Sequence, residues 1–191
     1  GIPVVFFNGY YPTLSGTYSV CADNQAGGAE LVRHLIDRGH TKIAGYFKSD
    51  DIQGHQRYSG FISELFRSGL IIPDENVFWY TTETKENLFD DPEEVLKRLG
   101  DNTAVVCYND EVAFGLVKCL LSAGRRVPED VAVVSFDNSN LSWISQVPIT
   151  SLSYEDRNIG RIAAQKLVDI LDGRDVSSEV LPWTFIQKES S

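Results

Sequence analysis

The sequence predicts an α/β fold in which parallel strands alternate with helices. Short apolar runs, bounded by turn residues as buried strands usually are, alternate with stretches that have an apolar residue every three to four positions. Strands and helices that alternate in this way form βα units, whose strands run parallel. Polar residues follow three of the apolar runs, beginning at Lys48, Asn109 and Asp137. Loops after parallel strands share one sheet edge, so these residues are expected to line one pocket.

The first part of the chain contains three expected strands and two expected helices. The strands are the apolar runs Ile2–Phe7, Tyr18–Ala22 and Ile43–Phe47. Asp23 is a good N-cap for a helix that stops at Gly39 and whose apolar face contains Ala29, Val32, Leu35 and Ile36. The second helix stops at Gly69, and its expected inner face contains Tyr58, Phe61, Ile62, Leu65 and Phe66.

The remaining chain continues the alternation. Four further strands are expected at Val77–Tyr80, Ala104–Tyr108, Val131–Phe136 and Ile149–Leu152. Asp91 and Pro92 begin a helix that ends at Gly100, and Asp110 is expected to cap a helix through Ala123. A long amphipathic helix is expected at Glu155–Leu171. The last extended segment, Glu179–Gln187, contains Pro182, which is typical of an edge or irregular strand.

Composition excludes several classes of protein. The chain has 17 Lys and Arg against 27 Asp and Glu, and its net charge of −10 repels nucleic acid because no basic cluster offsets it. It has no apolar run long enough to cross a membrane and no signal peptide, so no membrane partner is expected. Cys21, Cys107 and Cys119 show no metal-site spacing and are expected to be buried thiols of a cytoplasmic protein.

The loop Lys48–Gly54 is the first candidate for ligand binding. It carries Lys48, Asp50, Asp51 and Gln53, and Arg57 follows at the start of the next helix. These donors and acceptors suit a small polyhydroxylated ligand. Charged loop residues are as often simply solvated, so the prediction depends on their concentration at one strand end. Tyr10 and Tyr11, in an earlier loop, either pack or stack on a ligand, and packing is the favoured interpretation.

Sequence motifs of the common enzymes are absent. The chain contains no Gly-x-Gly-x-x-Gly, no P-loop and no Gly-x-Ser-x-Gly elbow. His34 and His40 have no third ligand at a spacing that would suit a metal, and no cofactor is expected. Paired carboxylates occur in both sugar-binding and glycosidase clefts. A hydrolase that uses Asp50 and Asp51, or Asp137, is therefore an alternative to a binding protein.

Seven stretches resemble the effector-binding domain of the LacI/GalR repressor family, whose fold is that of periplasmic sugar-binding proteins. They occur in the family's order, as IPVVFFN, ADNQAGGAELVRHLIDRGHTKIAG, RYSGF, VVCYNDEVAFGLV, VPEDVAVVSFDNS, PITSL and IGRIAAQKL. The segments NGYYP, FKSDDIQG, YTTETKE and CYNDE are similar to the arabinose-utilisation repressors of Gram-positive bacteria. Those repressors join a GntR-like winged-helix domain to this domain and respond to L-arabinose.

The resemblance implies a set of sugar-binding residues. The family's arginine falls on Arg57, three positions before Gly60, its Asn-Asp pair on Asn109 and Asp110, and its aspartate on Asp137. In the pair, Asn109 is the expected contact. Lys48 stands where many members have glycine, and Gly9 stands where an acidic residue is expected. The further candidates are Gln53, Asp51, Tyr154 and Tyr11, and the aromatic residues that could stack on the sugar are Phe47, Tyr108, Trp143 and Tyr154.

The resemblance also implies two lobes, of which the first is incomplete in this chain. Residues 1–41 and 152–176 are expected in the N-terminal lobe, and residues 42–151 and 177–191 in the C-terminal lobe. The chain has no methionine and begins inside a lobe, so we expect it to belong to a longer protein with a DNA-binding domain. Sugar binding between the lobes is expected to release a homodimer from operator DNA. A sugar-binding protein of transport is the alternative within the same fold.

Overall fold

The computed structural model describes residues 2–71, 73–154 and 158–191 and forms two compact units. The first unit comprises Gly1–Asp23 and Tyr154–Thr184. The second comprises Asn24–Ser153 and Phe185–Ser191. The chain thus passes between the units at three places. The expected lobe boundaries differ from these mainly in residues 24–41, because the helix Asn24–Asp37 packs on the helix Ile52–Arg67 of the second unit.

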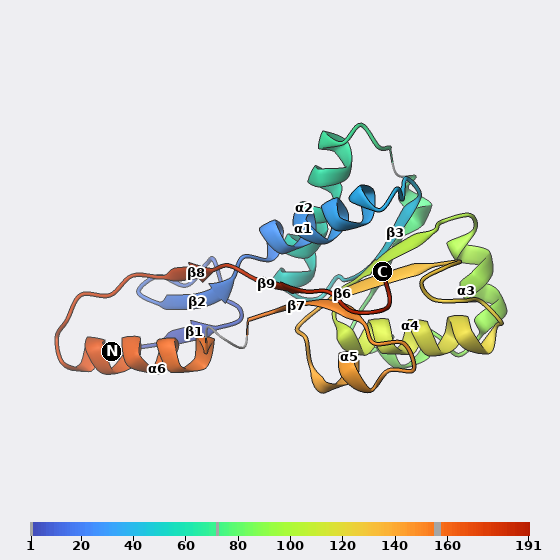
Figure 1. Ribbon diagram of the computed structural model, residues 1–191. Coiled ribbons are helices and arrows are strands. Elements are labelled where there is room, and N and C mark those ends of the chain that lie inside the picture. The colour runs from blue at the N-terminus through green and yellow to red at the C-terminus, as the bar shows by residue number, and fades with distance from the viewer. Residues whose placement is uncertain (1, 72, 155–157) are drawn as a thin grey trace. The chain divides into compact units, whose positions relative to one another are not determined.

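The first unit is built on a parallel sheet in the order β1-β2-β8. These strands are β1 (Val5–Phe7), β2 (Tyr18–Ala22) and β8 (Glu179–Leu181). Helix α6 (Ile159–Leu171) packs against β1 and β2 (Figure 1). Its buried and half-buried apolar positions include Ile159, Ile162, Ala163, Leu167 and Ile170, with Ile159 and Ala163 the most enclosed. The predicted start of this helix at Glu155 lies outside the described residues.

The second unit is built on a sheet in the order β4-β3-β5-β6-β7-β9. The strands are β3 (Ile43–Lys48), β4 (Val77–Tyr80), β5 (Ala104–Cys107), β6 (Ala132–Phe136), β7 (Thr150–Ser153) and β9 (Thr184–Ile186). From β4 to β7 each strand is parallel to its neighbours. All residues of β5 and β6 are buried, as expected for central strands covered on both faces. Because β5 and β6 are parallel, their carboxyl ends lie at the same edge of the sheet.

Helices cover both faces of this sheet (Figure 1). Helices α1 (Asn24–Asp37) and α2 (Ile52–Arg67) lie on one face, and α3 (Pro92–Leu99), α4 (Asp110–Ser122) and α5 (Asn140–Ile144) lie on the other. Two short 3₁₀ turns, η1 (Asp74–Asn76) and η2 (Lys85–Asn87), flank β4. Buried apolar side chains of α3 and α4 pack on β3, β4 and β5 in one hydrophobic cluster. The α/β prediction with parallel strands is confirmed.

Two local predictions were wrong, and one was confirmed only in part. Phe66 is 83% exposed, because the enclosed face of α2 instead includes Arg57 and Glu64, which face α1. The segment Glu179–Gln187 lies at sheet edges as expected, but it is divided into β8 and β9, which join different sheets, and Pro182 lies between them. Since proline has no N–H to donate, it suits this break. Finally, Asn109 rather than Asp110 caps α4, by accepting a 3.1 Å hydrogen bond from the Val112 N–H.

All three cysteines are buried free thiols in the described structure. Burial raises the pKa of the Cys21 thiol above its ordinary value, and it does the same for Cys119. These thiols are therefore protonated and unreactive at neutral pH. In the part of the chain that the structure describes, every helix is too short or too polar to cross a bilayer.

Helices α1 and α2 cross with their backbones in close contact at two glycines. A Cβ atom added to Gly60 would lie 2.0 Å from the Gln25 carbonyl oxygen, and one added to Gly28 would lie 2.3 Å from the Arg57 carbonyl oxygen. Both distances are far below van der Waals contact, so any larger residue forces the helices apart. The crossing therefore sets the position of Arg57 on α2.

We predict that Gly60→Ala destabilises the protein by about 1–3 kcal/mol, because the added methyl overpacks the crossing. Denaturant unfolding measures the change. Gly160→Ala is the matched control, because Gly160 is also helical but an added Cβ there meets nothing within 4 Å. Alanine at such a position favours the helix. Equal effects of the two substitutions would contradict the close crossing.

His34 connects α1 to the end of the chain. Its Nε2 lies 2.9 Å from the Ser191 hydroxyl, and its ring centroid lies 4.7 Å from that of Phe185. Burial, and then the positive charge of Arg38, lowers the pKa of His34 to about 4. The unfolded chain binds this proton near pH 6.5. Between about pH 6.5 and 4 the unfolded state therefore holds more protons, and the His34 contribution to stability is lost as the pH falls.

We predict that His34→Gln flattens the fall in unfolding free energy between pH 7 and pH 5, as measured by urea titration at each pH. A slope unchanged by His34→Gln would show that other groups cause the acid sensitivity.

Candidate functional site

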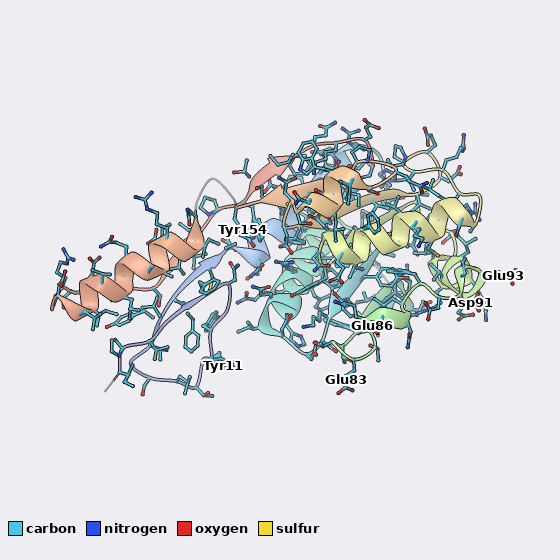
Figure 2. All side chains as sticks on the ribbon, turned by 90° about the horizontal axis from the view of Figure 1, so that it is seen from below. Tyr11, Glu83, Glu86, Asp91, Glu93 and Tyr154 are labelled. Atoms are coloured by element: carbon cyan, nitrogen blue, oxygen red, sulfur yellow. The ribbon has the colours of Figure 1, made fainter. Side chains whose placement is uncertain are left out.

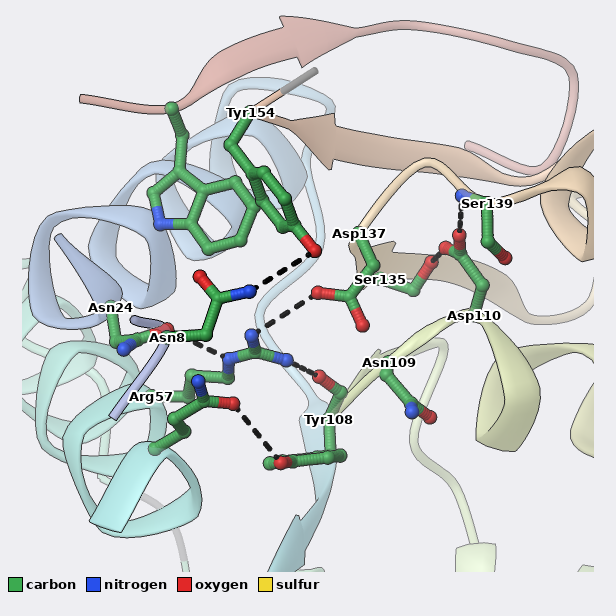
Figure 3. Close-up of polar contacts among 12 residues, drawn as sticks. Asn8, Asn24, Arg57, Tyr108, Asn109, Asp110, Ser135, Asp137, Ser139 and Tyr154 are labelled. Atoms are coloured by element: carbon green, nitrogen blue, oxygen red, sulfur yellow. Dashed lines mark hydrogen bonds and ion pairs between the residues drawn. The ribbon is translucent and has the colours of Figure 1, made fainter. Parts of the chain in front are cut away.

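Arg57 is the centre of the candidate site. Its side chain is buried on α2, and its residue exposure is only 2%. Its Nε donates a 3.0 Å hydrogen bond to Asn24 Oδ1, and its Nη1 donates to the Tyr108 carbonyl oxygen (Figure 3). Its Nη2 lies 3.2 Å from Asp137 Oδ1 in an ion pair. The guanidinium therefore joins α1, α2 and the carboxyl ends of β5 and β6.

Aromatic rings also enclose this guanidinium. Its Cζ lies 4.3 Å from the centroid of the Phe136 ring and 4.7 Å from that of the Tyr108 ring. Cation–π contacts are stronger when the cation is shielded from water, as it is here. The combination of rings and acceptors fixes Arg57 in one orientation.

Asp137 presents a carboxylate at the end of β6. Its backbone φ is +96°, in the left-handed region that residues other than glycine seldom adopt, and its N–H donates to the Leu152 carbonyl at 2.8 Å. Oδ1 faces Arg57, whereas Oδ2 accepts no hydrogen bond from the described residues. The side chain is 30% exposed. Asp137 thus offers an oriented acceptor at the surface of the second unit.

Asn109 stands at the end of the neighbouring strand β5. Its Oδ1 accepts the capping hydrogen bond from Val112, so the amide geometry leaves Nδ2 as a donor directed away from the helix. Asp110, the next residue, is 1% exposed and accepts hydrogen bonds from Ser135, Ser151 and Ser139. Burial raises the pKa of Asp110, and the serine hydrogen bonds oppose that rise.

The loop after β3 is connected to the same site through Tyr108. The Tyr108 hydroxyl donates to Asp51 Oδ2 at 2.7 Å and lies 3.4 Å from Gln53 Oε1. Asp51 also caps α2 through Gly54 N–H and pairs with Lys48 Nζ at 3.2 Å. Burial raises the pKa of Tyr108, so its hydroxyl remains a donor at neutral pH. Asp51 therefore holds the loop in place as well as offering a negative charge.

Asp50 has a different role in this loop. Its Oδ2 accepts a 2.9 Å hydrogen bond from the Thr82 N–H, which lowers the pKa of Asp50 to about 2, with Lys48 contributing to the shift. Asp50 therefore remains ionised at every physiological pH and ties the loop to the segment after β4. This environment is unlike that of a general acid.

Tyr154 and Tyr11 belong to the first unit. The Tyr154 ring packs edge-on against Trp183 with centroids 5.3 Å apart, and its hydroxyl lies 3.5 Å from Asn8 Nδ2. Tyr11 lies in the loop after β1, where it is 63% exposed and contacts the edge of Phe6 (Figure 2). A role for either residue in ligand binding remains a prediction.

Two of the expected stacking aromatics lie elsewhere. Phe47 is completely buried and packs against Phe61 with centroids 5.1 Å apart, so its expected role in stacking was wrong. The Phe47 side chain extends from β3 toward the layer formed by α1 and α2. Trp143 is 55% exposed on α5, and the Lys188 ammonium lies 4.2 Å from its ring centroid. Tyr108 contacts Arg57 through its ring.

Sequence reasoning missed the role of Asn24. This residue is buried, accepts from Arg57 and donates to Gln56 Oε1 at 3.0 Å. In the sequence it directly follows the expected cap Asp23, and only the packing of α1 on α2 brings its side chain to Arg57. Among the described residues no group of three or more His, Cys, Asp or Glu side chains could hold a metal. The contacts above make the site a set of hydrogen-bond donors and acceptors.

A parallel α/β unit with fixed polar groups at its carboxyl edge is typical of ligand-binding domains. The model of a periplasmic binding protein-like domain matches residues 32–191, so the chain belongs to that family. It is 36% identical over 177 residues to the arabinose metabolism transcriptional repressor of Halalkalibacterium halodurans. The aligned region covers 90% of this chain and 46% of that protein. The corresponding repressor of Geobacillus stearothermophilus is 35% identical over 178 residues, which covers 92% of this chain and 49% of that protein.

A solved structure shows the same fold. The transcriptional regulator CelR–cellobiose complex matches with a TM-score of 0.88 and 29% identity, over 98% of this chain and 58% of that chain. The resemblance to LacI/GalR effector-binding domains and the periplasmic-binding-protein-like fold class are confirmed. The chain spans about half the length of the curated relatives it matches.

Proposed function

We propose that this chain is the sugar-binding effector domain of a bacterial repressor of carbohydrate utilisation, with L-arabinose as its effector. The observation that carries the proposal is the buried Arg57 guanidinium, fixed beside the Asp137 carboxylate at the carboxyl edge of a parallel sheet. The arabinose metabolism repressors supply the choice of sugar, because two of them are about one-third identical to this chain.

The polar groups suit adjacent sugar hydroxyls. Arg57 would donate to two neighbouring oxygens, and Asp137 Oδ2 would accept from one of the same hydroxyls. Asn109 Nδ2 would donate from the end of β5, while Lys48, Asp51 and Gln53 would act from the loop after β3. A pocket that pairs each sugar hydroxyl with a buried polar group discriminates strongly against sugars that leave one of these groups unpaired.

In this proposal, sugar binding controls DNA binding through parts of the protein outside this chain. The operator would be bound in the cytoplasm by a separate domain, expected to be a GntR-like winged helix, and the protein would act as a homodimer. The sugar can shift the DNA-binding equilibrium only by its differential affinity for the two states, typically about 1–3 kcal/mol. Relatives that are named as transcriptional regulators favour this function over an enzyme or a transport protein.

We predict that L-arabinose stabilises the full-length protein against heat, whereas D-ribose, D-xylose, D-galactose and D-glucose do not. At one hundred times its Kd a ligand adds about 2.7 kcal/mol to the unfolding free energy, which a thermal-shift assay resolves as several degrees. Recovery of unchanged L-arabinose after long incubation, measured by chromatography, checks that the sugar is not a substrate. Stabilisation by a different sugar would identify that sugar as the effector instead of L-arabinose. If none of the five sugars raised the unfolding temperature, the result would contradict sugar binding.

We predict that Arg57→Lys weakens L-arabinose binding at least about tenfold, because lysine keeps the charge but loses the planar fork of donors. Isothermal titration calorimetry measures the affinity. Arg33→Lys is the matched control, since Arg33 is an α1 arginine that pairs with Glu64 at 3.2 Å and whose side chain is half exposed. Unchanged affinity in Arg57→Lys would remove Arg57 from the site.

A further inference from the structure

We propose that Asp110 is a positioning residue that holds the Asp137 carboxylate in its binding orientation. This inference rests on the proposed sugar-binding function and adds a residue that does not itself touch the ligand. It concerns the second unit alone, where both aspartates lie at the carboxyl ends of neighbouring strands.

Asp110 collects hydrogen bonds from two strands and one turn. Its Oδ1 accepts from the Ser151 hydroxyl of β7 at 2.7 Å and from the Ser135 hydroxyl of β6. Its Oδ2 accepts from the backbone N–H of Ser139, two residues after Asp137 (Figure 3). A carboxylate is costly to bury unless such donors surround it. Capping of α4 does not explain its presence, because Asn109 performs that function.

The turn that Asp110 holds is strained. Asp137 and Asn138 are consecutive residues with φ of +96° and +48°. Residues other than glycine remain in this region only when surrounding contacts impose it. The Asn138 N–H donates to Ser151 Oγ at 3.0 Å, and the same hydroxyl donates to Asp110. Asp110 thus fixes the two backbone N–H groups that follow Asp137. It accepts directly from the Ser139 N–H and holds the Asn138 N–H through the Ser151 hydroxyl.

The fixed turn determines where the Asp137 side chain points. The Asp137 N–H is held by Leu152, and the next two N–H groups are held by the Asp110 network, so the Cα–Cβ direction has little freedom. Oδ1 then meets Arg57 at 3.2 Å. The two aspartates therefore have different roles. The buried Asp110 orients the turn, and the half-buried Asp137 offers its carboxylate to the ligand.

The test uses Asp110→Asn in the full-length protein with L-arabinose as the probe. An amide has one acceptor oxygen, so it cannot accept from both the serine hydroxyls and the Ser139 N–H in the arrangement seen here. We expect binding to weaken about tenfold by calorimetry, as for the loss of one hydrogen bond to a charged group. Glu64→Gln is the matched control, because Glu64 is also a buried carboxylate but accepts from Arg33 and Arg67.

A double-mutant cycle separates positioning from general destabilisation. If Asp110 acts through Asp137, then Asp110→Asn has little effect on affinity once Asp137→Asn is present. An undiminished tenfold loss in that background would overturn the proposal. Should Asp110→Asn fail to fold, Ser151→Ala removes only the hydroxyl between Asn138 and Asp110, and its loss of affinity should likewise depend on Asp137.

A readout without sugar distinguishes failure of this inference from failure of the proposed function. Amide hydrogen exchange of Asn138 and Ser139, measured by NMR, should accelerate in Asp110→Asn more than in Glu64→Gln. Faster exchange in a protein that binds none of the sugars would support the positioning role and reject the proposed ligand. Unchanged exchange at both amides would overturn the positioning role, whatever the sugar affinity.

Discussion

The burial of the Arg57 guanidinium is the constraint on which the second unit depends. An isolated cation inside a protein is very unfavourable, so the surrounding residues must supply acceptors and rings. Asn24 supplies an acceptor oxygen from α1, and Tyr108 supplies a carbonyl and a ring from the end of β5. Asp137 supplies the negative charge. Removing any of them would leave part of the guanidinium unpaired. A stable fold of this unit and an ordered binding surface therefore follow from the same contacts.

The same constraint explains why α1 and α2 approach so closely. Asn24 can reach Arg57 only if the two helices touch, and they touch because Gly28 and Gly60 have no side chains at the crossing. The helix that the sequence placed with the N-terminal lobe thus joins the second unit in its packing. The close backbone approach at Gly28 and Gly60 stabilises the helix pair. It also orients Arg57, which lies about one helical turn before Gly60.

Sequence patterns predicted the strands, most helix ends and the three polar strand ends, because these depend on local periodicity and on turn and capping residues. Asp91, for example, accepts from Glu93 and Glu94 N–H groups as a cap should. Patterns failed where tertiary contacts decide the outcome. Arg57 and Glu64 interrupt the apolar face of α2, so periodicity assigned Phe66 to the interior in their place. The role of Asn24 and the network around Asp110 join residues up to 41 positions apart, which no local rule connects.

The distribution of carboxylates separates the paired acids of the candidate site from the exposed acids of this acidic chain. Exposed acids such as Glu83, Glu86, Asp91 and Glu93 lie in the segment after β4 and at the start of α3 (Figure 2). Within the site each carboxylate already faces donors: Asp51 faces Tyr108 and Lys48, and Asp137 faces Arg57. Lys48 also pairs with Asp50 at 3.5 Å, so Lys48 and Arg57 together face three carboxylates. Carboxylates engaged in this way are poorly placed to bind a metal ion, and an excess of acids disfavours a phosphate. The arrangement is consistent with the neutral sugar of the proposed function, whose hydroxyls both donate and accept.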